Sequence, residues 1–179
     1  MIDPVTFELW RGRLGFAGII TILIFIALLP MGGDAGHLPG PDLMTCVVFV
    51  WMMRRPDYLP LWLLAGAMLL SDILLMRPFG LWAALVVLAG EILRARAVLM
   101  RELNFFMEWA VVSGLMLTMM LAYRFGFALT LLPQVSLGAA LVQLLWSVIA
   151  YPAVVLFTGY VLALRKPSLG QLDAYGRKF

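Results

Sequence analysis

Residues 59–93 read LPLWLLAGAMLLSDILLMRPFGLWAALVVLAGEIL, which is two apolar runs joined by a short turn around Arg77 and Pro78. A helix that crosses the hydrocarbon core of a bilayer, about 30 Å thick, needs roughly 20 apolar residues, and these runs approach that length. Proline tends to end one helix and is well placed to begin the next. The stretch therefore predicts a tight hairpin of two membrane helices, over residues 58–76 and 79–93.

The rest of the chain has the same apolar character. Of its 179 residues, 64% are hydrophobic and 13% are charged, whereas soluble domains have about 45–50% apolar and about 25% charged residues. This composition excludes a soluble globular enzyme and predicts one polytopic membrane domain over residues 1–179, an all-α fold. Four further spans are expected over residues 14–30, 41–53, 104–123 and 135–164.

Three of these spans carry particular expectations. The first also suits a signal peptide, but no small-residue cleavage site follows it, so we expect a retained signal-anchor helix. The second is a run of only 11 residues, 43–53, and is the least secure prediction. The last is longer than a straight crossing needs, so we expect it to be tilted, kinked at Pro152 or partly interfacial.

The basic residues orient six helices in the membrane. With a cytoplasmic N-terminus, only Arg77 and Arg124 fall on the outer side, and the other eleven of the thirteen basic residues are cytoplasmic. Those eleven are Arg11, Arg13, Arg54, Arg55, Arg94, Arg96, Arg101, Arg165, Lys166, Arg177 and Lys178. Leaving out the second helix would invert everything after it, so the charge distribution favours six spans with both termini in the cytoplasm.

The sequence carries no constellation typical of catalysis or of metal binding. Cys46 and His37 are its single cysteine and single histidine, and it has no Gly-rich phosphate loop, nucleophile elbow or HExxH pattern. The net charge of +3 is too small and too segregated for a nucleic-acid surface. We therefore expect no enzymatic activity, no cofactor, no metal and no nucleic-acid partner.

Three of the acidic residues within the predicted spans are candidates for a functional role. Asp72 is well inside one, so it either serves as a relay or ligand contact, or bonds Arg77, Ser71 or helix-end amides and fixes the hairpin. We favour the structural role, because a lone acid makes a poor relay. Glu91 precedes Arg94 by three residues and should form an ion pair with it. Glu108 is expected near a helix N-terminus, within reach of the membrane interface.

Small residues spaced four apart form a stripe along the fifth predicted span. Such a stripe lets another helix approach closely in lipid, where packing replaces the hydrophobic effect as the driving force. We favour a seam within the bundle over a contact with a partner protein. The stripe comprises Ala110, Gly114, Thr118, Ala122 and Gly126. A weaker row in the first span comprises Gly12, Gly15 and Gly18.

Residues 55–83, RPDYLPLWLLAGAMLLSDILLMRPFGLWA, resemble the MreD family, the small rod shape-determining membrane proteins of bacteria. The resemblance lies in a turn, an acid within a span and the residues that open the next span, and it extends loosely over the whole chain. The motif residues are Arg55, Pro56, Asp72, Arg77, Pro78 and Gly80. Met68 and Met76 stand where the family tends to have glycine.

The resemblance implies a non-enzymatic scaffold of the cell-elongation complex in the bacterial inner membrane. Such a scaffold binds the single-span protein MreC, and through it RodA, a class B transpeptidase and MreB, in support of peptidoglycan synthesis and cell shape; membrane lipids are further partners. The family is also similar to the six-helix substrate-binding components of vitamin transporters. A small-molecule or lipid-binding transporter component is therefore the alternative, and a wide polar cavity would favour it.

Overall fold

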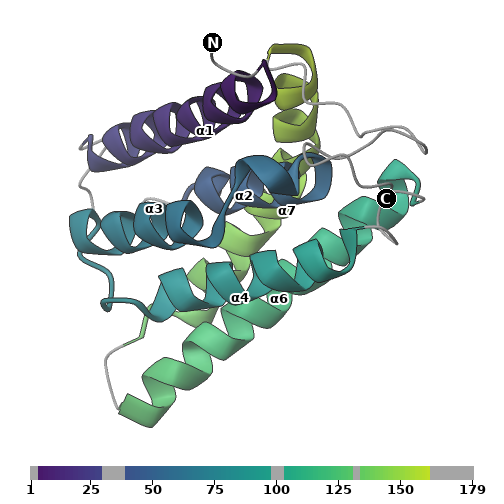
Figure 1. Ribbon diagram of the computed structural model, residues 1–179. Helices are drawn as coiled ribbons and strands as arrows, with labels where there is room; N and C mark the ends of the chain where they lie inside the picture. The colour runs from purple at the N-terminus through teal and green to yellow at the C-terminus, as the bar shows by residue number, and fades with distance from the viewer. Residues whose placement is uncertain (1–3, 30–38, 98–102, 131–133, 162–179) are drawn as a thin grey trace.

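The computed structural model describes residues 4–29, 39–97, 103–130 and 134–161, which form an all-α protein (Figure 1). Its six described α-helices are α1 (Pro4–Leu28), α2 (Leu43–Arg54), α3 (Leu61–Leu74), α4 (Leu81–Ala95), α6 (Phe105–Thr130) and α7 (Leu137–Val161). A short 3-10 helix, η1 (Pro56–Tyr58), leads from α2 into α3. The elements pack largely in sequence, α3 on α4, α4 on α6 and α6 on α7, while α1 packs on α3.

The second helix, α2, is the core of the bundle. It contacts α1, α4 and α7, and each residue from Met44 to Met53 is buried. The only polar side chain in that run is Thr45, which leaves the helix no water-facing side. A helix that is apolar all round is stable only when it is surrounded by other elements. The span predicted over residues 41–53 therefore exists as a helix, which is short and surrounded by other elements.

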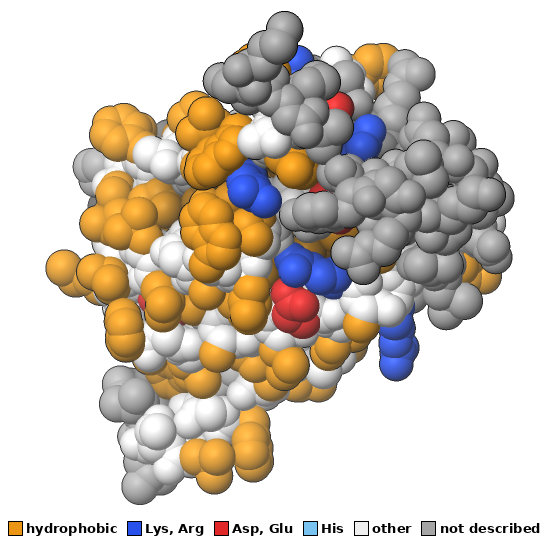
Figure 2. All heavy atoms as spheres, viewed as in Figure 1, with side chains coloured by type: hydrophobic (Ala, Val, Ile, Leu, Met, Phe, Trp, Pro, Cys, Tyr) orange, Lys and Arg blue, Asp and Glu red, His pale blue; other side chains and the backbone are white. Residues whose placement is uncertain are grey.

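Three described helices are long and apolar enough to cross a membrane: α1, α6 and α7. Their exposed surface is rich in large apolar side chains, such as Phe25, Leu121 and Leu156. Figure 2 shows hydrophobic side chains spread over the visible face with few charged ones among them. A soluble protein would leave such a surface in contact with water, whereas a bilayer solvates it. The chain is therefore a multi-pass membrane protein by the length and composition of these helices.

Each of the six predicted spans coincides with a described helix, but several ends differ. Helix α1 begins at Pro4, ten residues before the predicted start, and α6 continues to Thr130, seven residues beyond the predicted end. The helices α2, α3 and α4 contain 12, 14 and 15 residues, which is about 18–22 Å at 1.5 Å per residue. Residue 30 of the first predicted span and residues 162–164 of the last lie outside the described residues.

Helix α7 continues through Pro152. Proline has no amide hydrogen, so it leaves the carbonyl of Val148, one turn earlier, without its helical donor. The indole Nε1–H of Trp109, on α6, donates to that carbonyl oxygen at 2.9 Å. This bond satisfies a group that would otherwise be costly in an apolar environment, and it joins α6 to α7.

Candidate functional site

The acid of the family-like motif, Asp72, links the two helices of the hairpin. Its side chain is completely buried, and its Oδ2 accepts a hydrogen bond of 3.0 Å from the backbone amide of Ala83 in the first turn of α4. The N-cap residue of α4 is Gly80, which has no side chain to do this. Asp72 therefore caps α4 from the end of α3, which agrees with the structural role expected for it.

The turn after α3 is a Schellman motif. The amide of Met76 donates to the carbonyl of Ile73 at 3.3 Å, and the amide of Arg77 donates to the carbonyl of Asp72 at 3.0 Å. The residue at the centre of such a motif adopts the left-handed conformation, which usually requires glycine. Here that residue is Met76, with φ 52°. The departure from the family's glycine therefore lies at a position where the backbone favours one.

Replacing Met76 by glycine should stabilise the protein by about 1 kcal/mol, because glycine adopts positive φ without a steric cost. The methionine side chain is 94% exposed, so its loss removes little packing. The measurement is the free energy of unfolding in mixed micelles. Met76→Ala is the matched control, since alanine keeps the cost of a left-handed backbone and should leave stability unchanged. Equal gains from both variants would contradict this explanation.

The other part of the motif, Arg55 and Pro56, lies at the opposite end of α3 from Asp72. Arg55 is the C-cap residue of α2, and Pro56 begins η1. The Arg55 guanidinium lies 5.6 Å from the centre of the Tyr58 ring. The Tyr58 hydroxyl donates to Glu8 of α1 at 3.2 Å. The turn thus fixes Tyr58 against α1. The motif residues consequently form two structural joints and do not converge on one site.

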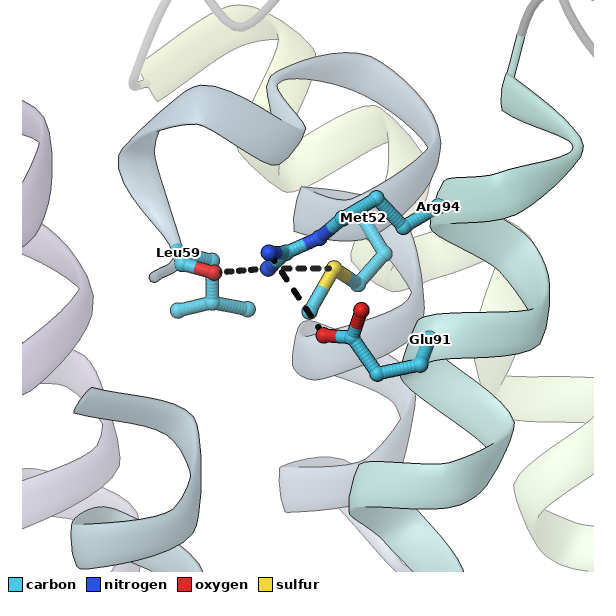
Figure 3. Close-up of polar contacts among 4 residues, drawn as sticks. All are labelled: Met52, Leu59, Glu91 and Arg94. Carbon is cyan, nitrogen blue, oxygen red and sulfur yellow. Dashed lines mark hydrogen bonds and ion pairs between the residues drawn. The ribbon is translucent and has the colours of Figure 1, made fainter. Parts of the chain in front are cut away.

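A third joint is made by Arg94, near the end of α4 (Figure 3). Its guanidinium donates to the backbone carbonyl of Leu59 and approaches the sulfur of Met52 at 3.8 Å. It also pairs with Glu91 at 3.5 Å, which confirms the ion pair expected from their spacing. Arg94 therefore connects α4 to α2 and to the segment between η1 and α3.

Glu108 does not reach the membrane interface as expected. It is 1% exposed, and its Oε1 accepts a hydrogen bond of 3.0 Å from the hydroxyl of Tyr151 on α7. The first turn of α6 faces the bundle at this position, so the carboxylate is held inside it. The pairing with Tyr151 was not apparent from the sequence, because the two residues are 43 positions apart.

The small-residue stripe of α6 is mostly not a seam within the bundle. Ala110, Gly114 and Thr118 are exposed, and a Cβ added to Gly114 would meet nothing within 4 Å. The buried side of the helix instead carries Glu108, Val112, Met116 and Met119. At the other end of the stripe, Ala122 and Gly126 are half-buried, and a Cβ on Gly126 would lie 3.3 Å from Leu81 of α4. The expected seam is therefore present only at the Gly126 end.

A cavity of about 380 Å³ lies between α2, α4, α6 and α7, next to the α3–α4 turn. Arg77 and Arg124 both contribute to its wall, together with the aromatic rings of Trp82 and Tyr123. The Arg77 guanidinium lies 5.8 Å from the centre of the Trp82 ring. Sequence reasoning placed the two arginines on the same side of the membrane but did not place them in one cavity.

Comparisons with known proteins give no relative for this chain. No protein-family model matches the sequence, and no curated protein and no solved structure matches it significantly.

Proposed function

We propose that this protein is a non-enzymatic scaffold of the bacterial cell-elongation complex, similar to MreD, which binds a single-span membrane protein of the MreC type. It crosses the inner membrane six times with both termini in the cytoplasm. Through that partner it supports RodA, a class B transpeptidase and MreB in peptidoglycan synthesis. The motif resemblance over residues 55–83 and the distribution of basic residues support this proposal.

The observation that carries the proposal is the exposed half of the α6 stripe. Helix α6 is long and apolar enough to span a membrane, and Ala110, Gly114 and Thr118 give it a shallow outward face with no partner among the described residues. In lipid, helices associate by close packing through such small residues. This face fits one apolar helix of a single-span protein, which is the kind of partner that the resemblance implies.

Six crossings are compatible with the shortness of α2. Its 12 residues cover about 18 Å, less than the hydrocarbon thickness, and non-helical backbone at membrane depth is tolerated where protein surrounds it or where it lines a polar cavity. Helix α2 meets both conditions. It is buried from Met44 to Met53, and its N-cap residue Asp42 lies in the wall of the cavity.

The test is capture of an MreC-type partner by the full-length protein in nanodiscs. Gly114→Leu fills the outward face of α6 and should reduce capture by at least about tenfold, because helices held apart lose their close packing. Gly18→Leu is the matched control, since Gly18 is also exposed in a membrane helix with nothing within 4 Å of an added Cβ. An intact protein that never captures such a partner would refute the proposal.

The cavity specifically favours the alternative function, a component that binds a small molecule or a lipid. Ligand sites usually occupy about 300–1,000 Å³ and combine apolar walls with a few polar groups. At about 380 Å³, with two arginines in its wall, this cavity meets both conditions. Binding of a ligand is compatible with a scaffold role.

A further inference from the structure

The two basic residues that are assigned to the outer side of the membrane both line one cavity. Eleven of the thirteen lysines and arginines are assigned to the cytoplasmic side, and the exceptions are Arg77 and Arg124. They are 47 positions apart and belong to different segments, yet both line the same cavity. Charge bias alone gives no reason for two outer arginines to converge, so their placement points to a role in that cavity.

Both guanidinium groups keep donors available for an anion. Arg124 uses Nη1 to donate to the carbonyl of Val135 at 2.9 Å, and Arg77 stacks over Trp82. Each guanidinium has five N–H donors, so these contacts leave several of them uncommitted. Neither arginine forms an ion pair with a carboxylate in the part of the chain that the structure describes. Two unpaired guanidinium groups in one cavity attract an anion.

The acid in the cavity wall, Asp42, offsets only one of the two positive charges. Asp42 accepts hydrogen bonds at Oδ1 from the amide of Thr45, at 3.2 Å, and at Oδ2 from its hydroxyl, at 2.8 Å. Its carboxylate is thus committed to the cap of α2. The described charged groups of the wall are Arg77, Arg124 and Asp42, so the wall keeps a net positive charge.

The cavity also has an apolar part. On α6 its wall continues from Arg124 to Met120 and Met116, which covers about 12 Å at 1.5 Å per residue. Leu144 of α7 lines the same cavity. Methionine side chains adapt to irregular apolar ligands, because they are unbranched and polarisable. A ligand that fits this wall has a charged group at one end and an apolar part at the other.

We propose that this cavity binds an anionic amphiphile, with a phosphate or carboxylate group held between Arg77 and Arg124 and an apolar part against Met116, Met120 and Leu144. A membrane phospholipid and a single-chain organic anion that enters from water share this chemistry. The proposal concerns a surface separate from the exposed face of α6, so it does not depend on the scaffold function.

The experiment measures ligand affinity and thermal stabilisation of the full-length protein in a neutral detergent. The probes are phosphatidylglycerol, dodecyl phosphate, phosphatidylcholine and inorganic phosphate. We expect saturable stabilisation by an anionic probe that carries a chain, and weaker effects of the other two. Arg77→Gln combined with Arg124→Gln should lower the affinity by at least about tenfold, because charge-assisted hydrogen bonds are lost.

Two further variants keep the test sharp. Arg96→Gln removes one positive charge from an exposed position at the end of α4 and should not change the affinity. Ala140→Phe adds bulk to the cavity wall with both arginines intact, so it should also weaken binding. The double variant is not expected to disturb orientation, since removing outer positive charges strengthens the cytoplasmic bias. If it fails to fold, Ala140→Phe still decides the question.

Each result distinguishes the possibilities. Stabilisation by phosphatidylglycerol and dodecyl phosphate that depends on the arginines supports the site with a membrane lipid as its source. Stabilisation by dodecyl phosphate alone supports it with a water-borne organic anion as its source. The proposal would be overturned if phosphatidylcholine or inorganic phosphate stabilised the protein as much as the anionic probes that carry a chain do. Full affinity in the double variant or in Ala140→Phe would also overturn it.

Discussion

Replacing Gly12 by alanine is expected to lower the free energy of unfolding by about 1–3 kcal/mol, the usual cost of overpacking a tight contact. A Cβ at Gly12 would lie 2.4 Å from Cδ2 and 2.5 Å from Cγ of Tyr58. These ring atoms lie next to the Cβ of Tyr58, so they cannot move away freely. The other end of the ring is held by the hydrogen bond from its hydroxyl to Glu8. The methyl group therefore has to push α1 away from η1. Unfolding in mixed micelles measures the change.

Gly15→Ala in the same helix is the matched control. A Cβ there would meet nothing within 4 Å, and alanine is a better helix former than glycine by about 1 kcal/mol. We therefore expect a neutral or stabilising effect at Gly15 beside the loss at Gly12. Similar effects of the two substitutions would mean that the contact with Tyr58 does not determine the packing of α1.

Replacing Asp72 by leucine is expected to destabilise the protein by about 1–3 kcal/mol, because the amide of Ala83 loses its acceptor in a buried environment. Leucine has the same branching as aspartate but is larger, so it leaves no cavity, and any overpacking adds to the loss of the cap. The measurement is again the free energy of unfolding in mixed micelles. A protease-sensitivity comparison of the α3–α4 turn would show whether the hairpin opens.

Asp72→Asn separates this capping role from a role in proton transfer. Asparagine keeps an oxygen that accepts from Ala83 but does not titrate, so we expect stability within about 1 kcal/mol of the original and full capture of the partner protein. Normal stability with loss of capture would show instead that protonation of Asp72 matters to function. A large loss of stability would show that the carboxylate itself is required.

The stripe on α6 shows where local sequence stops being informative. Spacing by four places Ala110, Gly114 and Thr118 on one side of a helix, and the structure agrees on that. Whether that side faces the bundle or the lipid depends on how α6 is rotated against α4 and α7. Larger residues set the rotation by filling the interior, among them Val112, Met116 and Met119, which are buried. Small residues alone carry no signal of that choice.

Buried polar contacts were only partly predictable. Glu91 and Arg94 lie within one helix turn, so their spacing predicted the ion pair between them. The contact between Glu108 and Tyr151, and the bond from Trp109 to Val148, join α6 to α7 across about 40 residues of sequence. Such contacts depend on the packing of two helices, which periodicity along one of them does not specify.

The sequence by itself determined that this protein belongs in a lipid bilayer and that it forms helices. A chain with 64% hydrophobic residues satisfies its backbone groups in lipid by forming helices, and turn residues such as Arg77-Pro78 mark where those helices end. Only the tertiary structure decided that α2, the span whose prediction was least secure, is the core of the bundle. It alone also decided that Arg77 and Arg124 line the same cavity. The reason is physical: composition and local spacing act within one helix, whereas burial and cavities arise from the fit between helices that are distant in sequence.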